Sequence, residues 1–587
     1  MNYAVRTPLA DKPAELGAFS DVVANLLYSR GVRTAEDAAA FLTPDYDSHT
    51  HDPFLMRDMD KAVERVHRAV KNNEKIIIYS DYDADGIPGG VVLHDALKKI
   101  GYDNFENYIP HRHDEGFGLN SGAIQGFKES GAKLLITIDC GIADLEEVAE
   151  AMGAGIDVVV TDHHMPPLAE DGIMQRLPDA YAILNPKVAS CAYPEKMLCG
   201  SGVVFKFVQA FFRKHGAEFG IKQDWEKWFL DMVGIATLSD MVPLTGENRT
   251  LAFYGLKVLK KTARPGLSQL FRKLRVKREY ISEDDVGFTI TPRINAASRM
   301  GEPKVAFDLL STSDEALAGA YADALEHVNN ERKGTVAALV KEVKKILAER
   351  DIVDKKAIVL GNPAWRPSLL GLVANSLAEE YGRPAFLWGR DGEGVIKGSC
   401  RSGKTNASGG AASVLAIMQK TPASFIAFGG HGASGGFEVS NESVHMLAES
   451  LEKAAEELSA AHADGNPALA QSAVEVDAVI SLEEISWDLY KDIEKLAPFG
   501  VGNPKPMFLV KGAFIDAVKS FGKEGNHTEL IFRDLAGRKI SAIQFFSPTE
   551  SLPKHVAAQK PVDIVAHIEK STFKNYPELR LRIVDIL

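Results

Sequence analysis

Three aspartates stand at alternate positions in the segment KIIIYSDYDADG, residues 75–86. Asp81, Asp83 and Asp85 follow a run of apolar residues, and Gly86 closes the turn. Three carboxylates this close together repel one another unless a cation lies between them. A solvated acidic turn is the alternative, and the DxDxD pattern alone does not decide between the two. Further donor residues elsewhere in the chain would favour the cation site.

Such donors recur downstream. Asp139 follows the apolar run LLITI, the triplet Asp162-His163-His164 follows IDVVVT, and Asp240 ends the helix-like stretch FLDMVGIATLSD. Carboxylate oxygens and imidazole suit Mn²⁺ or Mg²⁺ better than a structural zinc site, which more often recruits thiolates. With several carboxylates available, two ions about 3.5–4 Å apart could activate a water at a phosphorus centre. Chance placement of polar residues is the alternative, and a set of this size disfavours it. The candidate set is Asp83, Asp85, Asp139, His163 and Asp240.

Alternating strand and helix patterns surround these residues between about 61 and 200. Apolar strands are predicted to end at Tyr79, Pro110, Ile138 and Thr161, and helical patterns such as 88–100 and 145–152 lie between them. Alternation of this kind predicts a doubly wound parallel sheet. The aspartates then stand at the carboxyl ends of strands, where open α/β sheets bind their ligands.

The remaining chain divides into further regions. Residues 313–349 carry a helical stripe that indicates one long helix or two in tandem, with Ser313 and Asp314 as the N-terminal cap. A second α/β pattern begins at 355–361 and ends in the glycine-rich FGGHGASGGFEV, 428–439, which we interpret as a ligand loop. After a predicted linker at 464–467, short alternating runs predict a small antiparallel barrel or sandwich.

Composition limits the protein class. The chain has 587 residues, a formal charge of -13 and 45% apolar residues, which suits several globular domains and argues against a uniformly basic surface that coats duplex DNA. The N-terminal sequence lacks a secretory signal pattern, and no run of about 18 apolar residues occurs. We therefore expect a cytoplasmic protein without membrane contact. The cysteines show no metal-binding spacing, and we expect them to be reduced: Cys140, Cys191, Cys199 and Cys400.

The motifs DYDADG, TIDCG, TDHH and TLSD resemble the four motifs of the DHH phosphoesterase superfamily. Downstream segments are similar to those of its bacterial single-strand-specific exonucleases: EGFGLN, PRINAASR, KGSCRS, FGGHGASGG and APFGVGNPKP. The resemblance implies an α/β fold in which a doubly wound DHH domain is joined by a long helix to a smaller DHHA1-like α/β domain and then to an OB-like β-barrel. The implied boundaries are an N-terminal arm at 1–60, the DHH domain at 61–312, the helix at 313–350, the DHHA1-like domain at 351–463 and the barrel at 468–587.

The resemblance also assigns roles to individual residues. One or two Mn²⁺ or Mg²⁺ ions would be held by Asp81, Asp83, Asp85, Asp139, His163 and Asp240. Asp162 would orient its neighbours, and His164 would contact the scissile phosphate, so that Asp139, Asp162 and His164 form the catalytic set. Substrate contacts are expected from Arg112, Phe117, Arg293, Asn295, Arg299, Ser399, Arg401, Gly430 and His431. The chain departs from the family pattern at Pro88, Ser298 and Arg366, none of which belongs to the ligand set.

The activity that the resemblance implies is metal-dependent hydrolysis of single-stranded DNA from 5′ to 3′, with release of 5′-mononucleotides in DNA repair and recombination. Single-stranded DNA is the expected partner, with a helicase and a single-strand-binding protein as expected protein partners. Two other functions stay open: an RNA or oligonucleotide phosphodiesterase, because no residue is identified that reads the 2′-hydroxyl, and a catalytically silent nucleic-acid-binding scaffold of the same fold.

Overall fold

The computed structural model describes residues 3–9, 11–169, 172–349, 355–403, 413–463, 474–522, 525–553, 555–571 and 576–587, and of these the side chains of residues 431 and 461–463 are not described. The predicted linker at 464–467 lies outside these ranges. The chain divides into two compact units. Unit 1 comprises residues 1–49, 243–245 and 472–587, and unit 2 comprises residues 50–242 and 246–471. Among the described residues, none of the helices is long and apolar enough to cross a membrane.

The first sheet of unit 2 is a five-stranded parallel sheet in the order β3-β2-β4-β5-β6. Its strands are β2 (Ile76–Ser80), β3 (Phe105–Tyr108), β4 (Leu134–Ile138), β5 (Asp157–Thr161) and β6 (Ala182–Leu184). All residues of β2 and β4 are buried, as expected for strands that are covered on both faces. The predicted parallel sheet is thus confirmed, although β3 ends two residues before Pro110, a residue that has no N–H to donate to a neighbouring strand.

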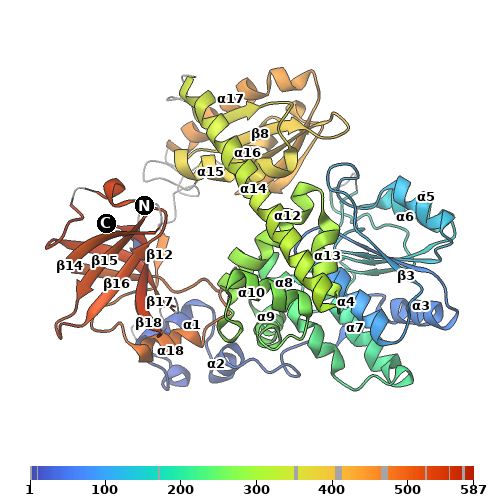
Figure 1. Cartoon of the computed structure of the whole chain (residues 1–587), viewed down its shortest axis with the longest axis horizontal. Helices are drawn as coiled ribbons and strands as arrows, with labels where there is room; N and C mark the ends of the chain where they lie inside the picture. The colour runs from blue at the N-terminus through green and yellow to red at the C-terminus, as the bar shows by residue number, and fades with distance from the viewer. Residues whose placement is uncertain are drawn as a thin grey trace. The chain divides into compact units, whose positions relative to one another are not determined.

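Helices cover both faces of this sheet (Figure 1). One face carries α3 (Met59–Lys71), α4 (Gly86–Lys99) and α7 (Gly200–His215), with α7 packed against the other two. The other face carries α5 (Ser121–Glu129) and α6 (Leu145–Gly153), which pack against each other. Helix α4 begins directly after the three aspartates of the turn that follows β2, so the strand–turn–helix unit fixes their position.

A helical layer follows the sheet. It consists of α8 (Leu230–Ser239), α9 (Gly246–Leu259), α10 (Pro265–Leu274), α11 (Glu283–Asp285), α12 (Thr291–Met300) and α13 (Pro303–Ser311). Helices α8 and α9 cross at two glycines, and a Cβ added at Gly255 would lie 2.5 Å from Cα of Gly234 and 2.9 Å from the carbonyl oxygen of Leu230. This close crossing fixes α8, which ends at Ser239, directly before Asp240.

Gly255→Ala is expected to lower the free energy of unfolding by about 1–3 kcal/mol, because the added methyl group forces the two backbones apart. Gly319→Ala is the matched control, since Gly319 is also helical and has no atom within 4 Å of an added Cβ. The control is expected to stabilise the protein by about 0.4–1 kcal/mol. Thermal unfolding measures the change in stability of both variants. Equal melting temperatures for the two variants would contradict the close contact between α8 and α9 at Gly255.

Helix α14 (Glu315–Glu349) is one continuous helix of 35 residues rather than two in tandem. The carboxylate of Asp314 accepts hydrogen bonds from the backbone N–H groups of Ala316 and Leu317 and so acts as the N-terminal cap. The helix packs against α10, α12 and α13 at its start and against α15 (Pro367–Tyr381) farther along. It therefore connects the first sheet and its helical layer to a second α/β region of unit 2.

That second region contains a mixed five-stranded sheet in the order β10-β11-β9-β8-β7. Its strands are β7 (Ile358–Gly361), β8 (Ala385–Arg390), β9 (Ile396–Arg401), β10 (Ala427–His431) and β11 (Ser434–Val439). Helices α15, α16 (Val414–Lys420) and α17 (Leu447–Ala463) accompany it.

The interpretation of the glycine-rich stretch 428–439 as a loop is wrong. It forms the antiparallel hairpin β10–β11, in which Gly429 pairs with Gly436 and Gly430 with Gly435. A Cβ at Gly435 would lie 2.8 Å from both the carbonyl oxygen of Gly429 and Cε of Met418. The close approach of neighbouring strands and of a core side chain therefore explains this glycine.

Unit 1 is built around a β-barrel. Strands β14 (Phe508–Phe521), β15 (His527–Arg533), β16 (Lys539–Gln544), β18 (Glu578–Ile586) and β17 (Pro561–Ser571) follow one another around it, and pairing of β14 with β17 closes it. The predicted C-terminal barrel is confirmed. Strand β13 (Ala478–Val479) pairs with β14, and α18 (Trp487–Glu494) precedes the barrel strands.

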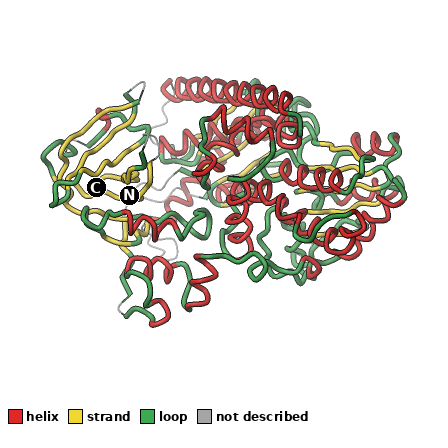
Figure 2. Tube along the Cα trace, turned by 60° about the horizontal axis from the view of Figure 1, so that its bottom comes forward, coloured by secondary structure: helices red, strands yellow, loops and turns green. Residues whose placement is uncertain are grey.

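The N-terminal residues join this barrel rather than forming a separate arm. Strand β1 (Tyr3–Val5) pairs in parallel with β12 (Val474–Val476), and Figure 2 marks both chain ends among the barrel strands. Helix α1 (Asp21–Ser29) packs into the same apolar core as the barrel, and α2 (Ala35–Leu42) follows it. The guanidinium of Arg30 also donates a 2.7 Å hydrogen bond to the side chain of Asn503.

Candidate metal centre

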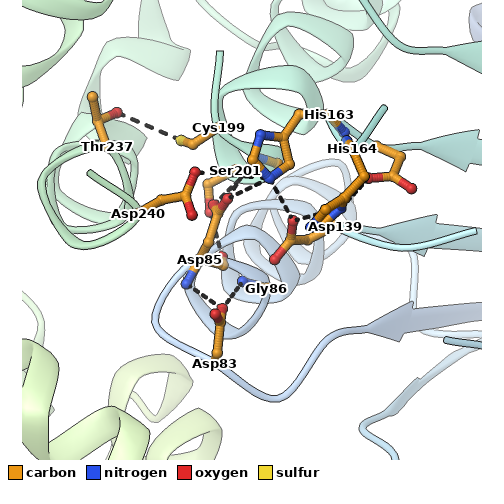
Figure 3. A network of polar contacts seen from close by, with 12 residues as sticks. Asp83, Asp85, Gly86, Asp139, His163, His164, Cys199, Ser201, Thr237 and Asp240 are labelled. Atoms are coloured by element: carbon orange, nitrogen blue, oxygen red, sulfur yellow. Dashed lines mark hydrogen bonds and ion pairs between the residues drawn. The ribbon is translucent and has the colours of Figure 1, made fainter. Parts of the chain in front are cut away.

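The acidic residues and histidines identified in the sequence come together at the carboxyl edge of the first sheet (Figure 3). Nε2 of His163 lies 3.2 Å from Oδ1 of Asp139, 3.7 Å from Oδ2 of Asp240 and 3.8 Å from Oδ2 of Asp85. The turn after β2, the ends of β4 and β5 and the residue after α8 supply these groups. Three sets have donor atoms within 4.8 Å of one another: Asp85 with His163 and Asp240, Asp81 with Asp83 and Asp139, and Asp139 with His163 and His164.

The turn after β2 is fixed by backbone hydrogen bonds. The carboxylate of Asp83 accepts from the N–H groups of Asp85, at 2.7 Å, and Gly86, at 3.1 Å. The carboxylate of Asp85 accepts from the N–H groups of Gly200 and Ser201, at 2.6 and 2.7 Å, in the first turn of α7. A carboxylate is stabilised at a helix N-terminus by the free N–H groups and the helix dipole. Helix α7 therefore holds Asp85 in place.

Asp139 has an unusual backbone conformation at the end of β4. Its φ is +63°, a left-handed value that is uncommon for residues other than glycine and clusters at functional sites. A Cβ added at Gly200 would lie 2.6 Å from Cβ of Asp139, so the N-terminus of α7 approaches this side chain as closely as glycine permits. Both constraints fix the direction in which the Asp139 carboxylate points.

Asp162 holds the adjacent histidines. Its Oδ1 accepts from the backbone N–H groups of His163 and His164 and lies 2.8 Å from Nδ1 of the His164 ring, and its Oδ2 accepts from the N–H of Ile142. Burial is the largest single effect and lowers the pKa of His164, but the hydrogen bond with Asp162 and the negative charges of Asp162, Asp240 and Asp85 together outweigh burial and raise this pKa to about 9. A charged, half-exposed imidazole therefore faces the site. The ring of Phe117, which is 52% exposed, lies edge-on to it at 5.5 Å.

The site has the electrostatics of a cation site. Burial and the neighbouring carboxylates raise the pKa of Asp81 and Asp139, that of Asp85 to about 6 and that of Asp240 to about 8. Oδ1 of Asp81 and Oδ1 of Asp139 are buried and accept no hydrogen bond within the described part of the chain. Five carboxylates and an imidazole fit Mn²⁺ or Mg²⁺. Burial and the adjacent His164 lower the pKa of His163 to about 3, which keeps this ring neutral, as a ligand requires.

Sequence reasoning missed several residues of this site. The side-chain amide of Asn185 donates a 2.9 Å hydrogen bond to the carbonyl oxygen of His164. Burial lowers the pKa of Lys187, and Asp240 is the first of the carboxylates that oppose this shift. Both residues follow β6, which has only three residues and gave no recognisable apolar run. The N–H groups of Gly200 and Ser201 carry no side-chain signal at all.

Some of the expected substrate residues are arginines that lie close enough for their charges to act on one another. The guanidinium of Arg112 lies over the ring of Tyr82 at 4.8 Å. Burial, followed by repulsion from Arg112, Arg332 and Arg401, lowers the pKa of Arg299 to about 9, although its guanidinium also donates to the carbonyl oxygen of Ser368 at 2.7 Å. Within the described part of the chain, Arg112, Arg299 and Arg401 form no ion pair with a carboxylate, although the charge of Asp83 acts on Arg299.

Residues of β9 continue this group. Ser399 and Arg401 lie under α15, since a Cβ at Gly371 would lie 3.0 Å from Nη2 of Arg401 and 3.6 Å from Oγ of Ser399. Gly430 lies in strand β10 with a φ of +137°. The side chain of His431 lies outside the described residues.

Two other expected substrate residues contact protein groups instead. Nε of Arg293 forms a 2.6 Å ion pair with Glu326 on α14, which neutralises its charge. The side-chain oxygen of Asn295 accepts a 2.9 Å hydrogen bond from the N–H of Ala84, in the turn after β2. Asn295 thus supports the acidic turn itself.

The three departures from the family pattern lie in or at the start of helices, and none of them is a member of the ligand set. Pro88 is buried in the first turn of α4, Ser298 is buried in α12, and Arg366 precedes α15 as its N-cap residue.

Comparison with known proteins agrees with this arrangement. Residues 75–237 match the model of the DHH family N-terminal domain, residues 354–463 that of the DHHA1 domain and residues 476–585 that of the RecJ OB domain. The single-stranded-DNA-specific exonuclease RecJ of Bacillus subtilis is 32% identical over 100% of this chain and 70% of its own length. The protein of the same name from Haemophilus influenzae is 29% identical over 90% of this chain and 91% of its own length.

Solved structures show the same fold. The crystal structure of RecJ from Thermus thermophilus in complex with Mn²⁺ superimposes with a TM-score of 0.77 at 24% identity, over 100% of this chain and 79% of that one. A crystal structure of exonuclease RecJ bound to manganese gives a TM-score of 0.55 at 29% identity, over 68% of this chain and 95% of that one. The four DHH motifs, the domain order and the identity over the full chain show that this protein belongs to the RecJ family of DHH phosphoesterases.

Proposed function

We propose that this protein is a Mn²⁺- or Mg²⁺-dependent exonuclease that hydrolyses single-stranded DNA from 5′ to 3′ and releases 5′-mononucleotides in DNA repair and recombination. The observation that carries the proposal is the cluster of five carboxylates and one imidazole in which buried oxygens of Asp81 and Asp139 accept no hydrogen bond from the described residues. Relatives that are 29–32% identical over most of this chain are named single-stranded-DNA-specific exonucleases, which supports the substrate.

The metal ligands are Asp81, Asp83, Asp85, Asp139, His163 and Asp240. Ions held there supply an activated water and neutralise charge on the phosphate. Asp139 belongs to two of the three donor sets and so joins them. Asp162 keeps His164 protonated, and the imidazolium donates a hydrogen bond to the scissile phosphate or its leaving oxygen, where negative charge develops.

The group of arginines binds the phosphates beside the reacting one. Arg112, Arg299 and Arg401 offer planar forks of N–H donors that match phosphate oxygens, and Ser399 offers a hydroxyl. Phe117 stacks on a base, since aromatic faces accept any base sequence.

Residues 61–312 form the catalytic domain, 351–463 the second substrate-binding domain and 468–587 the OB-like domain. A helicase and a single-strand-binding protein are the proposed partners, because they generate and hold single strands.

Digestion of end-labelled DNA tests the activity. Single-stranded oligonucleotides labelled at the 5′ or the 3′ end are incubated with the full chain and Mn²⁺, Mg²⁺ or EDTA, beside duplex DNA and RNA of the same sequence. The expected result is immediate release of the 5′ label as a mononucleotide, late release of the 3′ label, and no cleavage in EDTA or of blunt duplex. Faster cleavage of RNA would favour the oligonucleotide phosphodiesterase, and binding without cleavage under either metal would overturn the enzyme.

A further inference from the structure

A strongly basic surface lies at the ends of α9 and α10, in a part of unit 2 that the proposed reaction does not use. Residues 257–278 contain nine lysines and arginines and no aspartate or glutamate, although the whole chain has a formal charge of -13. Of the nine, only Arg264 and Lys273 form ion pairs with carboxylates in the described part of the chain. Five exposed side chains without such a pair define the basic surface: Lys257, Lys260, Lys261, Arg275 and Lys277.

The two segments that carry the basic surface lie side by side. The guanidinium of Arg278 donates a hydrogen bond to the carbonyl oxygen of Thr262, so residues 275–278 return to the end of α9. On α9, burial and the charge of Lys261 lower the pKa of Lys257. The cations of this surface therefore repel one another, and a bound anion would remove the repulsion.

The helix dipoles account for only part of this charge. The carboxyl end of a helix carries about half a negative charge and attracts cations in its last turn. Lys257 supplies such a cation on α9, and Arg272 and Lys273 supply them on α10. The four other members of the basic surface come after these turns, so their charges need an anion from outside the chain.

A buried hydrogen-bond network fixes the loop between α9 and α10. Nε of Arg264 lies 2.9 Å from Oδ2 of Asp231 in the first turn of α8, and Oγ1 of Thr262 donates to the same oxygen at 2.7 Å. Asp240 follows the other end of α8, whose 10 residues span about 15 Å. Helix α9 packs along α8 (Figure 1). The basic surface is therefore held rigidly near the end of α8 that lies away from the metal centre.

We propose that the basic surface binds the phosphate backbone of a nucleic acid at a distance from the metal centre. The proposal rests on the proposed function, which makes DNA the polyanion that this protein meets. Phosphates follow one another at about 3.4 Å along a strand, so several exposed cations on one rigid surface can each meet a phosphate. An acidic chain needs such a local surface, because its overall charge repels DNA.

Two sources offer this backbone. One is the single strand itself, several nucleotides beyond the phosphate that reacts, since about 15 Å corresponds to four or more steps of about 3.4 Å. The other is a duplex from which the single strand projects. Both present the same phosphodiester groups, and the experiment below compares them.

Equilibrium binding of labelled DNA to the full chain tests the basic surface, with EDTA present to prevent metal-dependent cleavage. The parent is compared with a variant that carries Lys260→Gln, Lys261→Gln and Lys277→Gln, on a single strand and on a blunt duplex, over a range of salt concentrations. The matched control replaces three exposed lysines elsewhere in unit 2 by glutamine: Lys128, Lys222 and Lys453. A further variant replaces the three lysines of the basic surface by arginine, which keeps their charge.

We expect the glutamine variant to bind one or both DNAs at least about tenfold more weakly than the parent, the control and the arginine variant. The slope of log K against log salt should fall by about 2 on the single strand or by about 3 on the duplex, since each lost phosphate contact contributes about 0.7 or 0.9. A loss on the single strand alone identifies the strand that is hydrolysed, and a loss on the duplex identifies the adjacent duplex. With Mg²⁺ the glutamine variant should keep the parent's kcat, because the basic surface lies away from the reacting phosphate.

Equal affinities and salt slopes for the parent and the glutamine variant on both DNAs would overturn the proposal. The same loss in the arginine variant would also overturn it, since charge would then not be the cause. Polyglutamate serves as a competing anion, and loss of its binding with DNA binding retained would assign the surface to an acidic protein instead. A parent that binds DNA through this surface but cleaves none with Mn²⁺ or Mg²⁺ would contradict the proposed function alone.

Discussion

Asp139→Asn is expected to lower kcat for single-stranded DNA by about a thousandfold or more, at least the loss seen when one preorganised catalytic group is removed. Asp139 lies in both the Asp81–Asp83 set and the His163–His164 set, so its carboxylate can contribute a ligand atom to either set. Asparagine keeps the size of the side chain but offers a neutral, weaker ligand. Binding of single strands should change only a few-fold, because the arginines beyond the cluster are untouched.

Single-turnover digestion with saturating enzyme measures this loss separately from binding. Asp103→Asn is the matched control, since Asp103 is an exposed aspartate that pairs with Lys98 outside the cluster. Without metal the Asp139→Asn variant should be at least as stable as the parent, because it removes one of the mutually repelling charges. A rate within tenfold of the parent would exclude Asp139 as a shared ligand.

The metal-free protein is expected to lose stability as the pH rises from 5 to 8.5. Burial and the nearby carboxylates raise the pKa of Asp240 to about 8 and that of Asp85 to about 6, whereas unfolded aspartates ionise near 3.9. The folded state therefore binds more protons than the unfolded state across this range, and each such proton lowers the free energy of unfolding by about 1.4 kcal/mol per pH unit. For Asp240 the total is on the order of several kcal/mol.

Thermal unfolding in EDTA across this pH range measures the effect, read from the transition that responds to added Mn²⁺. Saturating Mn²⁺ should remove the pH dependence, since a cation between the carboxylates keeps them ionised. Asp240→Asn in EDTA should flatten the curve, because a carboxyl group whose pKa is raised to about 8 is then absent. A melting temperature that stays constant or rises with pH in EDTA would contradict the repulsion inferred from the structure.

The ligand cluster could be predicted from the sequence because most of its residues come directly after an apolar strand pattern ends. Asp139 and His163 follow buried, mostly apolar or β-branched strands, and parallel strands end at one edge of their sheet. The closed barrel could be predicted for a similar reason, since alternating runs in the sequence give its strands. In both cases the pattern of apolar residues within a short segment is enough to predict the strand.

The features that could not be predicted depend on contacts between distant segments. Asp85 is held by the N–H groups of Gly200 and Ser201, which no side-chain pattern reveals. Arg293 lies in a motif shared with the family, but its partner Glu326 is 33 residues away on another helix. The glycines of β10 and β11 have the composition of a loop, and only the packing of neighbouring strands explains why they form a hairpin.

The pairing of β1 with β12 has a consequence for the order of events during synthesis. Unit 1 is assembled from residues near both ends of the chain, and residues 50–471 lie between its two main segments. Ribosomes add about 5–20 residues per second, so the N-terminal helices wait for tens of seconds before their barrel emerges. The apolar side chains of α1 that fill the barrel core, such as Leu26 and Leu27, are exposed for that time. Unit 2, which contains the ligand cluster, is therefore synthesised completely before the apolar side chains of α1 can be buried in the barrel of unit 1.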